Sequence, residues 1–344
     1  MKVYERLNLA LRKLDSDAER ITLKDILAQE RTSSYSALFE KMLKGILENR
    51  LLLDALLSML SAIPLHRYRR EEYFYLLIGA YGIVFLEKPD YALVNNILNL
   101  MKRRSPHRVA PANAILRRLA REKDSLITSL LEGKNAQERL SLCYSVHPEL
   151  VEMLVEQYGQ EQAEAYFLHA QKTPPLDLCV IGLDRETYMT NLLEEGIDVK
   201  SLPGTYSGVR LLTFAQSIQT LPGYAEGHFY IMGWASQLIG ELVPVTGRLL
   251  DLCSAPGGKS ISIKNRWPET QLTLCDISQE RLAKLKDNLQ RVRMSADIYQ
   301  HDAVEDRPAF HHSFDVVLLD APCSSSGLLH RHPDLRRSIT RERV

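Results

Sequence analysis

The stretch LLDLCSAPGGKS (249–260) constrains the fold more than any other part of the chain. An apolar run leads into a loop of small residues, and a helix is predicted to begin directly after it. Gly257 and Gly258 tolerate backbone angles that other residues avoid and let a ligand approach the main chain closely. The first N–H groups of the helix would face that ligand. The spacing fits neither GxGxxG nor a Walker loop, and a tight strand–helix turn without a ligand is the alternative.

The same order of strand and helix continues through the last third of the chain. Strand candidates occur in GRLLDLC, QLTLCDI, SADIYQHD and FDVVLLD, and helix patterns occur in GGKSISIKNRW and SQERLAKLKDNLQRVR. Such alternation predicts a parallel sheet with helices on both faces. We therefore assign residues 231–344 to a Rossmann-like α/β domain.

Three acidic residues are expected at the ends of these strands. Asp276 lies 18 residues after Gly258, and in doubly wound folds an acid about 20 residues after the loop binds ribose hydroxyls. Asp302 and Asp320 end the next two predicted strands. Because ligands of such folds bind at the carboxyl ends of the strands, we predict a nucleoside-type site here. The alternative for Asp276 is that it only caps the helix starting at Ser278.

The first 230 residues show different patterns. Up to about residue 132, apolar side chains recur three and four positions apart, as in VYERLNLALRKL, which predicts helices. The polar stretch EGKNAQERL (132–140) interrupts this pattern. Two helices, the strand candidates LCVIGL, IDVKSL and GVRLLTF, and a helix capped by Asp184 follow. The predicted domains are a helical domain (1–132), a small α/β connecting module (141–230) and the α/β domain (231–344).

The formal net charge of the chain is zero, so any surface for a polyanion must be local. One segment, 101–123, is strongly basic and contains a single acid, Glu122. Its density of cations on predicted helices fits contacts with nucleic-acid phosphates, and an ordinary solvated face is the alternative. The predicted RNA-binding residues are Lys102, Arg103, Arg104, Arg108, Arg117, Arg118, Arg121 and Lys123.

The five cysteines are scattered and show no CxxC spacing, which argues against a disulfide framework or a zinc site. The sequence HRH (330–332) has no evident third ligand, so we expect no metal. The N-terminus lacks an apolar signal-peptide core, and no stretch is long and apolar enough to span a membrane. These features predict a cytoplasmic protein with no membrane partner, and we expect a monomer.

The motif DAPCSSSG follows the last predicted strand and places Cys323 three residues after Asp320. A thiol at this position suggests chemistry at carbon. A thiolate that adds to C6 of a pyrimidine makes C5 nucleophilic, and a nearby carboxyl group can support the ring nitrogen. The alternative is that Cys323, as a lone cysteine, is structural.

Four motifs together carry a specific resemblance. LLDLCSAPGGKS, CDISQERL, HDA and FDVVLLDAPCSSSGLLHRHPD, in this order, resemble the bacterial Sun/RsmB family of ribosomal RNA small-subunit methyltransferases B. YFYLLIGAYGIVFLEKPDYALVNNILNLMKRR with ANAILRRLAREK is similar to the family's NusB-like RNA-binding domain, and LPGYAEGHFYIMGWASQL resembles its connecting module. The resemblance implies an enzyme that forms 5-methylcytosine in 16S ribosomal RNA with S-adenosylmethionine as cofactor.

The resemblance also implies roles for single residues. Asp276 would bind the ribose hydroxyls of the cofactor, Asp302 its adenine end, and Asp320 would lie near both cofactor and cytosine. Cys323 matches the family's cysteine that assists product release, so Asp320 and Cys323 are the implied catalytic residues. The loop implied to hold the cofactor consists of Cys253, Ser254, Ala255, Pro256, Gly257, Gly258 and Lys259.

The family's attacking cysteine belongs to a Thr-Cys motif after the fifth strand, and no Thr-Cys pair occurs in these 344 residues. We therefore expect a family member cut before its nucleophile, with an incomplete α/β domain, an exposed apolar edge at FDVVLLD and no activity as this fragment. One alternative is a catalytically dead RNA-binding protein that keeps the cofactor fold. Another is an S-adenosylmethionine enzyme in which Cys323 itself attacks.

Overall fold

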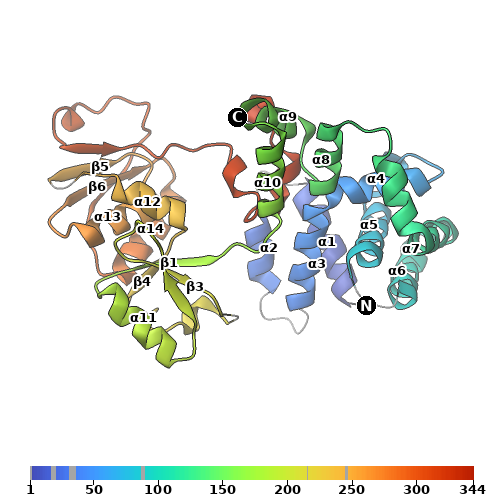
Figure 1. Ribbon diagram of the computed structural model, residues 1–344, viewed down its shortest axis with the longest axis horizontal. Helices are drawn as coiled ribbons and strands as arrows, with labels where there is room; N and C mark the ends of the chain where they lie inside the picture. The colour runs from blue at the N-terminus through green and yellow to red at the C-terminus, as the bar shows by residue number, and fades with distance from the viewer. Residues whose placement is uncertain (1, 17–20, 31–35, 87–89, 215, 245–246) are drawn as a thin grey trace. The chain divides into compact units, whose positions relative to one another are not determined.

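The computed structural model describes residues 2–16, 21–30, 36–86, 90–214, 216–244 and 247–344 (Figure 1). The chain forms two compact units. The helical unit combines Met1–Thr173 with Cys323–Val344, and the α/β unit is Pro174–Pro322. The two units meet at residues 173/174 and 322/323. The predicted domain boundaries, at 132–140 and 230/231, lie elsewhere and stay predictions. In the part of the chain that the structure describes, no helix is long and apolar enough to cross a membrane.

The front of the chain is helical, as the spacing of apolar residues predicted. Its helices are α1 (Lys2–Ser16), α2 (Leu23–Glu30), α3 (Ser36–Glu48), α4 (Arg50–Leu60), α5 (Arg70–Phe85), α6 (Asp90–Arg104), α7 (Val109–Leu131), α8 (Ala136–Tyr144), α9 (Pro148–Tyr158) and α10 (Gln160–Ala170).

Helix α5 is the centre of this unit and packs against α1, α3, α4, α6 and α7 (Figure 1). It is buried on nearly all sides, because its sequence is apolar all round rather than along one stripe. Tyr81 of α5 lies so close to Gly45 of α3 that a Cβ atom on Gly45 would collide with the phenol ring. Glycine is therefore needed at this crossing.

A buried hydroxyl joins α8 to α4. Ser145 follows α8 in the left-handed conformation, at φ 49°, and is fully buried. Its Oγ accepts hydrogen bonds from the N–H groups of Leu51 and Leu52, at 3.1 and 3.3 Å. These donors open α4, whose own N-cap residue, Asn49, makes no side-chain cap. Residues 132–135 of the predicted polar stretch form the turn before α8, and residues 136–140 already belong to α8.

The α/β unit contains two sheets. The first is antiparallel with strand order β2-β3-β1-β4, and the second is parallel with order β7-β6-β5-β8, which confirms the predicted parallel sheet. The elements are β1 (Leu176–Val180), α11 (Arg185–Glu194), β2 (Val199–Ser201), β3 (Gly208–Leu211), β4 (Phe229–Ile231), α12 (Trp234–Glu241), β5 (Arg248–Asp251), α13 (Gly258–Arg266), β6 (Gln271–Asp276), α14 (Gln279–Arg291), β7 (Asp297–Gln300) and β8 (Val316–Leu318).

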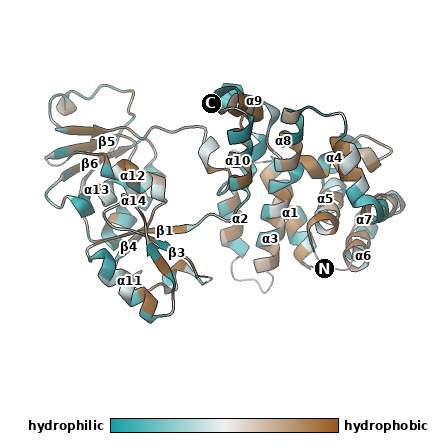
Figure 2. Cartoon of the chain, viewed as in Figure 1, coloured by the Kyte–Doolittle hydropathy of each residue, from teal (hydrophilic) through white to brown (hydrophobic). Residues whose placement is uncertain are grey.

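The parallel sheet is most buried at β5 and β6, whose apolar residues stand out in Figure 2. Helices α13 and α14 pack on β6, α14 through a stripe of buried leucines at positions 282, 285 and 289. Strand β8 has three residues, and among the described strands it pairs with β5 alone. Val317 and Leu319 are 57% and 60% exposed, so this edge of the described sheet is apolar, as the sequence predicted.

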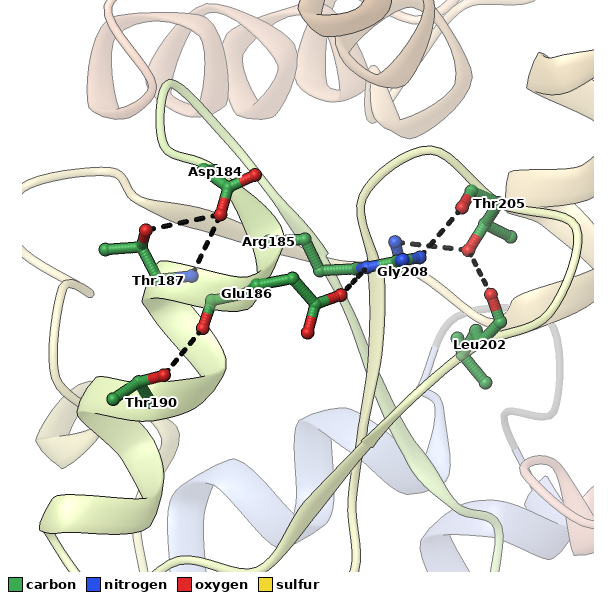
Figure 3. A network of polar contacts seen from close by, with 8 residues as sticks. All are labelled: Asp184, Arg185, Glu186, Thr187, Thr190, Leu202, Thr205 and Gly208. Carbon is green, nitrogen blue, oxygen red and sulfur yellow. Dashed lines mark hydrogen bonds and ion pairs between the residues drawn. The ribbon is translucent and has the colours of Figure 1, made fainter.

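Polar contacts hold the antiparallel sheet and its helix together (Figure 3). Asp184 caps α11 by accepting a hydrogen bond from the Thr187 N–H at 3.0 Å, which confirms the predicted N-cap. Arg185 donates to the Thr205 carbonyl at 3.0 Å, and the Thr205 hydroxyl accepts from the Gly208 N–H at 3.2 Å. These bonds fix α11 to the turn that leads into β3.

Asn265 of α13 joins the two sheets. Its amide donates to the Val180 carbonyl at 2.8 Å and accepts from the Gly182 N–H at 3.0 Å, both at the end of β1. The hydrophobic core continues across the same junction, since Cys179 and Met232 pack with residues of the parallel sheet. The antiparallel sheet, β1 to β4, therefore packs beside the region that holds the glycine-rich loop.

Candidate functional site

The loop between β5 and α13 lies at the carboxyl edge of the parallel sheet and is tied to the next strand. The Ser254 N–H and hydroxyl both donate to the Cys275 carbonyl in β6, at 2.8 and 2.9 Å. Gly257 ends the loop at φ 104°, which other residues rarely adopt, and a Cβ there would approach Leu285 within 2.6 Å. The predicted strand–loop–helix arrangement is present, with α13 beginning at Gly258.

Asp276 lies beneath this loop at the last position of β6 and is 1% exposed. Its carboxylate accepts from the N–H groups of Ala255 at 3.3 Å and Ser278 at 3.0 Å, and pairs with Arg281 at 3.2 Å. Arg281 in turn donates to the Ala255 carbonyl at 2.5 Å. Asp276 therefore organises both the loop and the start of α14, where Ser278 is the N-cap residue.

Asp320 and Lys259 form an ion pair between the end of β8 and the first turn of α13. Asp320 is about half exposed, and it follows β8 by two residues rather than ending it. Asp302 likewise follows β7 by two residues, and its carboxylate accepts a hydrogen bond from the Val304 N–H in its own turn at 3.1 Å. The structure thus joins the loop to Asp276 and Asp320, whereas Asp302 bonds locally.

Asp251, at the end of β5, is a candidate that the sequence analysis missed. It is 2% exposed, and one carboxylate oxygen accepts from the Ser260 hydroxyl at 2.5 Å. The other oxygen is buried without a hydrogen-bond partner among the described residues. Burial, with a smaller contribution from the charge of Asp320, raises the pKa of Asp251 to about 6. Its position directly before the glycine-rich loop was the available signal.

Tyr230 and Asn288 were also missed, and they reach the loop from other elements. Asn288 of α14 donates to the Pro256 carbonyl at 2.9 Å, and the Tyr230 hydroxyl donates to the same carbonyl at 3.3 Å. The Tyr230 ring lies 3.0 Å from where a Cβ on Gly258 would stand. No motif marks these residues, because their approach depends on how β4 and α14 pack around the loop.

The predicted catalytic pair falls into different units. Asp320 belongs to the α/β unit and Cys323 to the helical unit, where its thiol is exposed. The two residues are linked through the chain by Ala321 and Pro322.

The basic segment 101–123 is less cationic in space than in sequence. Acidic residues from α1 and α5 approach it: Arg103 pairs with Glu5 at 3.9 Å and Arg104 with Glu71 at 3.4 Å. Further pairs join Arg108 to Glu72 at 3.7 Å and Arg118 to Glu122 at 2.9 Å. The pairs of the exposed arginines are weak and can be exchanged for phosphate contacts. Glu72 is 3% exposed, so its pair with Arg108 is not of this kind. The arginine side chains of the segment, Arg108 apart, remain well exposed.

The groups around the loop fit a ligand that carries several hydrogen-bond donors. The partly exposed carboxylates of Asp302 and Asp320 offer acceptors, and the buried carboxyl of Asp251 lies directly before the loop. A nucleoside with hydroxyl and amino groups supplies such donors. Within the described ranges, no group of three or more His, Cys, Asp or Glu residues is placed to hold a metal ion.

The raised pKa of Asp251 makes a prediction about stability. The native state holds the proton of the Asp251 carboxyl more tightly than the unfolded chain does. The protonated carboxyl therefore stabilises the fold at low pH relative to high pH, and this stabilisation is lost as the pH rises from about 4 to about 6. At pH 8 the buried charge costs on the order of 3 kcal/mol. Asp251→Asn should remove this pH dependence. Urea unfolding followed by tryptophan fluorescence measures it, because both tryptophans, Trp234 and Trp267, lie in the α/β unit.

The matched control is Asp287→Asn, which replaces an exposed carboxylate on α14 and should leave the wild-type pH profile intact. Parallel profiles of the wild type and Asp251→Asn from pH 4 to pH 8 would contradict the assignment.

Comparisons with known proteins agree with this fold. Residues 242–344 match the family model described as 16S rRNA methyltransferase RsmB/F, and residues 2–121 match the NusB family. These matches confirm the predicted NusB-like helical domain and the methyltransferase type of the α/β domain.

Two solved structures share the fold. The crystal structure of PH0851 aligns with a TM-score of 0.72 at 19% identity, covering 99% of this chain and 77% of that one. The crystal structure of NSun6 from Pyrococcus horikoshii with SFG aligns with a TM-score of 0.50 at 17% identity, covering 57% of this chain and 75% of that one. At these identities the likeness concerns the fold alone.

The similarity to whole proteins is more specific. Ribosomal RNA small subunit methyltransferase B of Klebsiella pneumoniae (strain 342) is 30% identical over 317 residues, which cover 90% of this chain and 71% of that protein. The protein of the same name from Photorhabdus laumondii subsp. laumondii is 28% identical over 329 residues, which cover 94% of this chain and 75% of that protein. The chain therefore belongs to the ribosomal RNA small subunit methyltransferase B family.

Proposed function

We propose that this chain carries the cofactor and RNA sites of an enzyme that uses S-adenosylmethionine to form 5-methylcytosine in small-subunit ribosomal RNA, and that the attacking thiol is not among these 344 residues. The observation that carries the proposal is the loop at the carboxyl edge of the parallel sheet, which is bonded to the carboxylates of Asp276 and Asp320. The ribosomal RNA substrate follows from the names of the relatives and from the NusB match. A cytoplasmic location and a monomeric state remain part of the proposal.

The loop from Cys253 to Lys259 would hold the cofactor, with Asp276 at its ribose and Asp302 at its adenine end. Support comes from the related fold of NSun6 with SFG, an analogue of S-adenosylmethionine. Besides binding the ribose, Asp276 would hold the loop in shape, because its carboxylate bonds to Ala255 and Arg281. The bound cofactor supplies the methyl group, and the chain orients it toward the base.

On the substrate side we propose that Asp320 supports the cytosine ring and that Lys259 holds the Asp320 carboxylate in place. Cys323 assists release of the product and is not the attacking thiol. The methylation of C5 requires a thiolate at C6, because C5 of an unactivated pyrimidine is a poor nucleophile. This thiolate would come from the family's Thr-Cys motif, which these 344 residues do not contain. The basic segment 101–123 would hold the phosphates of the RNA.

Calorimetric titration with S-adenosylmethionine tests the cofactor site. Asp276→Ala should weaken binding by about 1–3 kcal/mol, because it removes a buried acceptor and releases the loop. Asp276→Asn keeps an acceptor oxygen for the Ala255 N–H and should lose less. The exposed Asp287→Asn should bind like the wild type. Failure of the folded wild-type protein to bind, or equal affinity of Asp276→Ala and the wild type, would reject the site.

The salt dependence of RNA binding tests the basic segment. Replacement of Arg103, Arg104, Arg117 and Arg118 by alanine should flatten the plot of log affinity against log salt, by roughly 0.7–0.9 for each phosphate that the variant no longer neutralises. Lys134→Ala with Arg139→Ala removes two cations outside the segment and is the control. An unchanged slope in the fourfold variant would mean that the segment is only a solvated face.

A further inference from the structure

Arg336 is fully buried, although it lies in a short surface turn, Pro333–Arg337, after the Pro-Cys motif. Its neighbour Arg337 is exposed. Burial of a guanidinium is costly unless its donors find acceptors, so its partners identify what it does. Both terminal nitrogens of Arg336 have acceptors, and the buried Nε–H has none among the described residues.

The acceptors are the last carbonyl groups of two helices. Arg336 donates from one terminal nitrogen to the Tyr144 carbonyl at 2.8 Å and from the other to the Ala170 carbonyl at 2.6 Å. Tyr144 ends α8 and Ala170 ends α10. Such carbonyls lack partners within their own helix and form the negative end of the helix dipole. One guanidinium thus caps two helices. The carbonyl of Arg336 also accepts from the His147 N–H, just before α9, at 2.8 Å.

The rest of the segment is fixed at intervals to the same three helices. Leu329 and Ile339, on either side of Arg336, are fully buried in a core with residues of α8, α9 and α10. The Tyr166 hydroxyl of α10 donates to the Ser326 carbonyl. At the far end, the Arg341 N–H donates to Glu149 at 2.8 Å. The attachment therefore begins three residues after Cys323.

We infer that Arg336 is a positioning residue, which anchors the segment carrying Cys323 to the ends of α8 and α10. The inference rests on the proposed function in so far as the Cys323 segment takes part in the reaction. Helices α8, α9 and α10 then do more than connect the two units along the chain. They also hold the segment 323–334 in place.

Hydrogen exchange and spin labelling of the 344-residue protein test this role. Arg336→Met should raise the exchange rate of peptides within 324–340 at least tenfold and leave α5 to α7 unchanged. Arg336→Lys, which keeps the charge and can reach one carbonyl, should lie between Arg336→Met and the wild type. Arg337→Met is the matched control, and its exchange should equal that of the wild type.

A nitroxide on Cys323, in a background with Cys143→Ser and Cys253→Ser, reports the position directly. Its spectrum should sharpen toward that of a mobile label in Arg336→Met and stay unchanged in Arg337→Met. Retained protection of 324–340 and an unchanged spectrum in Arg336→Met would overturn the inference. So would equal loss of protection throughout the helical unit, because Arg336 would then act only on stability. Neither readout uses the cofactor, so a failure of cofactor binding would reject the proposed function and leave this inference standing.

Discussion

The buried carboxylate of Asp276 is the contact on which the candidate site depends. It fastens the end of β6 to Ala255 in the glycine-rich loop and to Arg281 at the start of α14. Asp276 is almost fully buried whereas Arg281 is 43% exposed, so removal of the Arg281 charge would leave a poorly solvated carboxylate. Since the loop also bonds to β6 through Ser254, its shape follows from the order of β5 and β6 in the sheet.

The helical unit uses the same kind of contact at its helix ends. Ser145 supplies the acceptor that opens α4, and Arg336 supplies the donors that close α8 and α10. Each contact joins segments that lie far apart in the sequence. Helix ends expose unpaired backbone groups, so a single well-placed side chain can fix the meeting of several elements. The segment after Cys323 therefore belongs to the helical unit, although the chain reaches it from the α/β unit.

Local signals in the sequence predicted much of this structure. The glycine loop, the Asp184 cap and the leucine stripe of α14 each depend on residues within one or two turns of one another. The burial of Asp251, the approach of Tyr230 and the pairing of Arg104 with Glu71 depend on tertiary packing, which no local pattern encodes. The charge of the basic segment is another example. The segment itself contains a single acid, but packing brings Glu5 and Glu71 of other helices next to its arginines.

The role of Cys323 is tested most directly by RNA that carries 5-fluorocytosine in place of cytosine. Fluorine at C5 cannot leave as a proton, so a thiolate that has attacked C6 stays bound after methyl transfer. The 344-residue protein should form no such adduct on a denaturing gel with S-adenosylmethionine present, whereas a family member with a Thr-Cys motif should form one. An adduct that appears with this chain and vanishes in Cys323→Ser would contradict the account, because Cys323 would then be the attacking thiol.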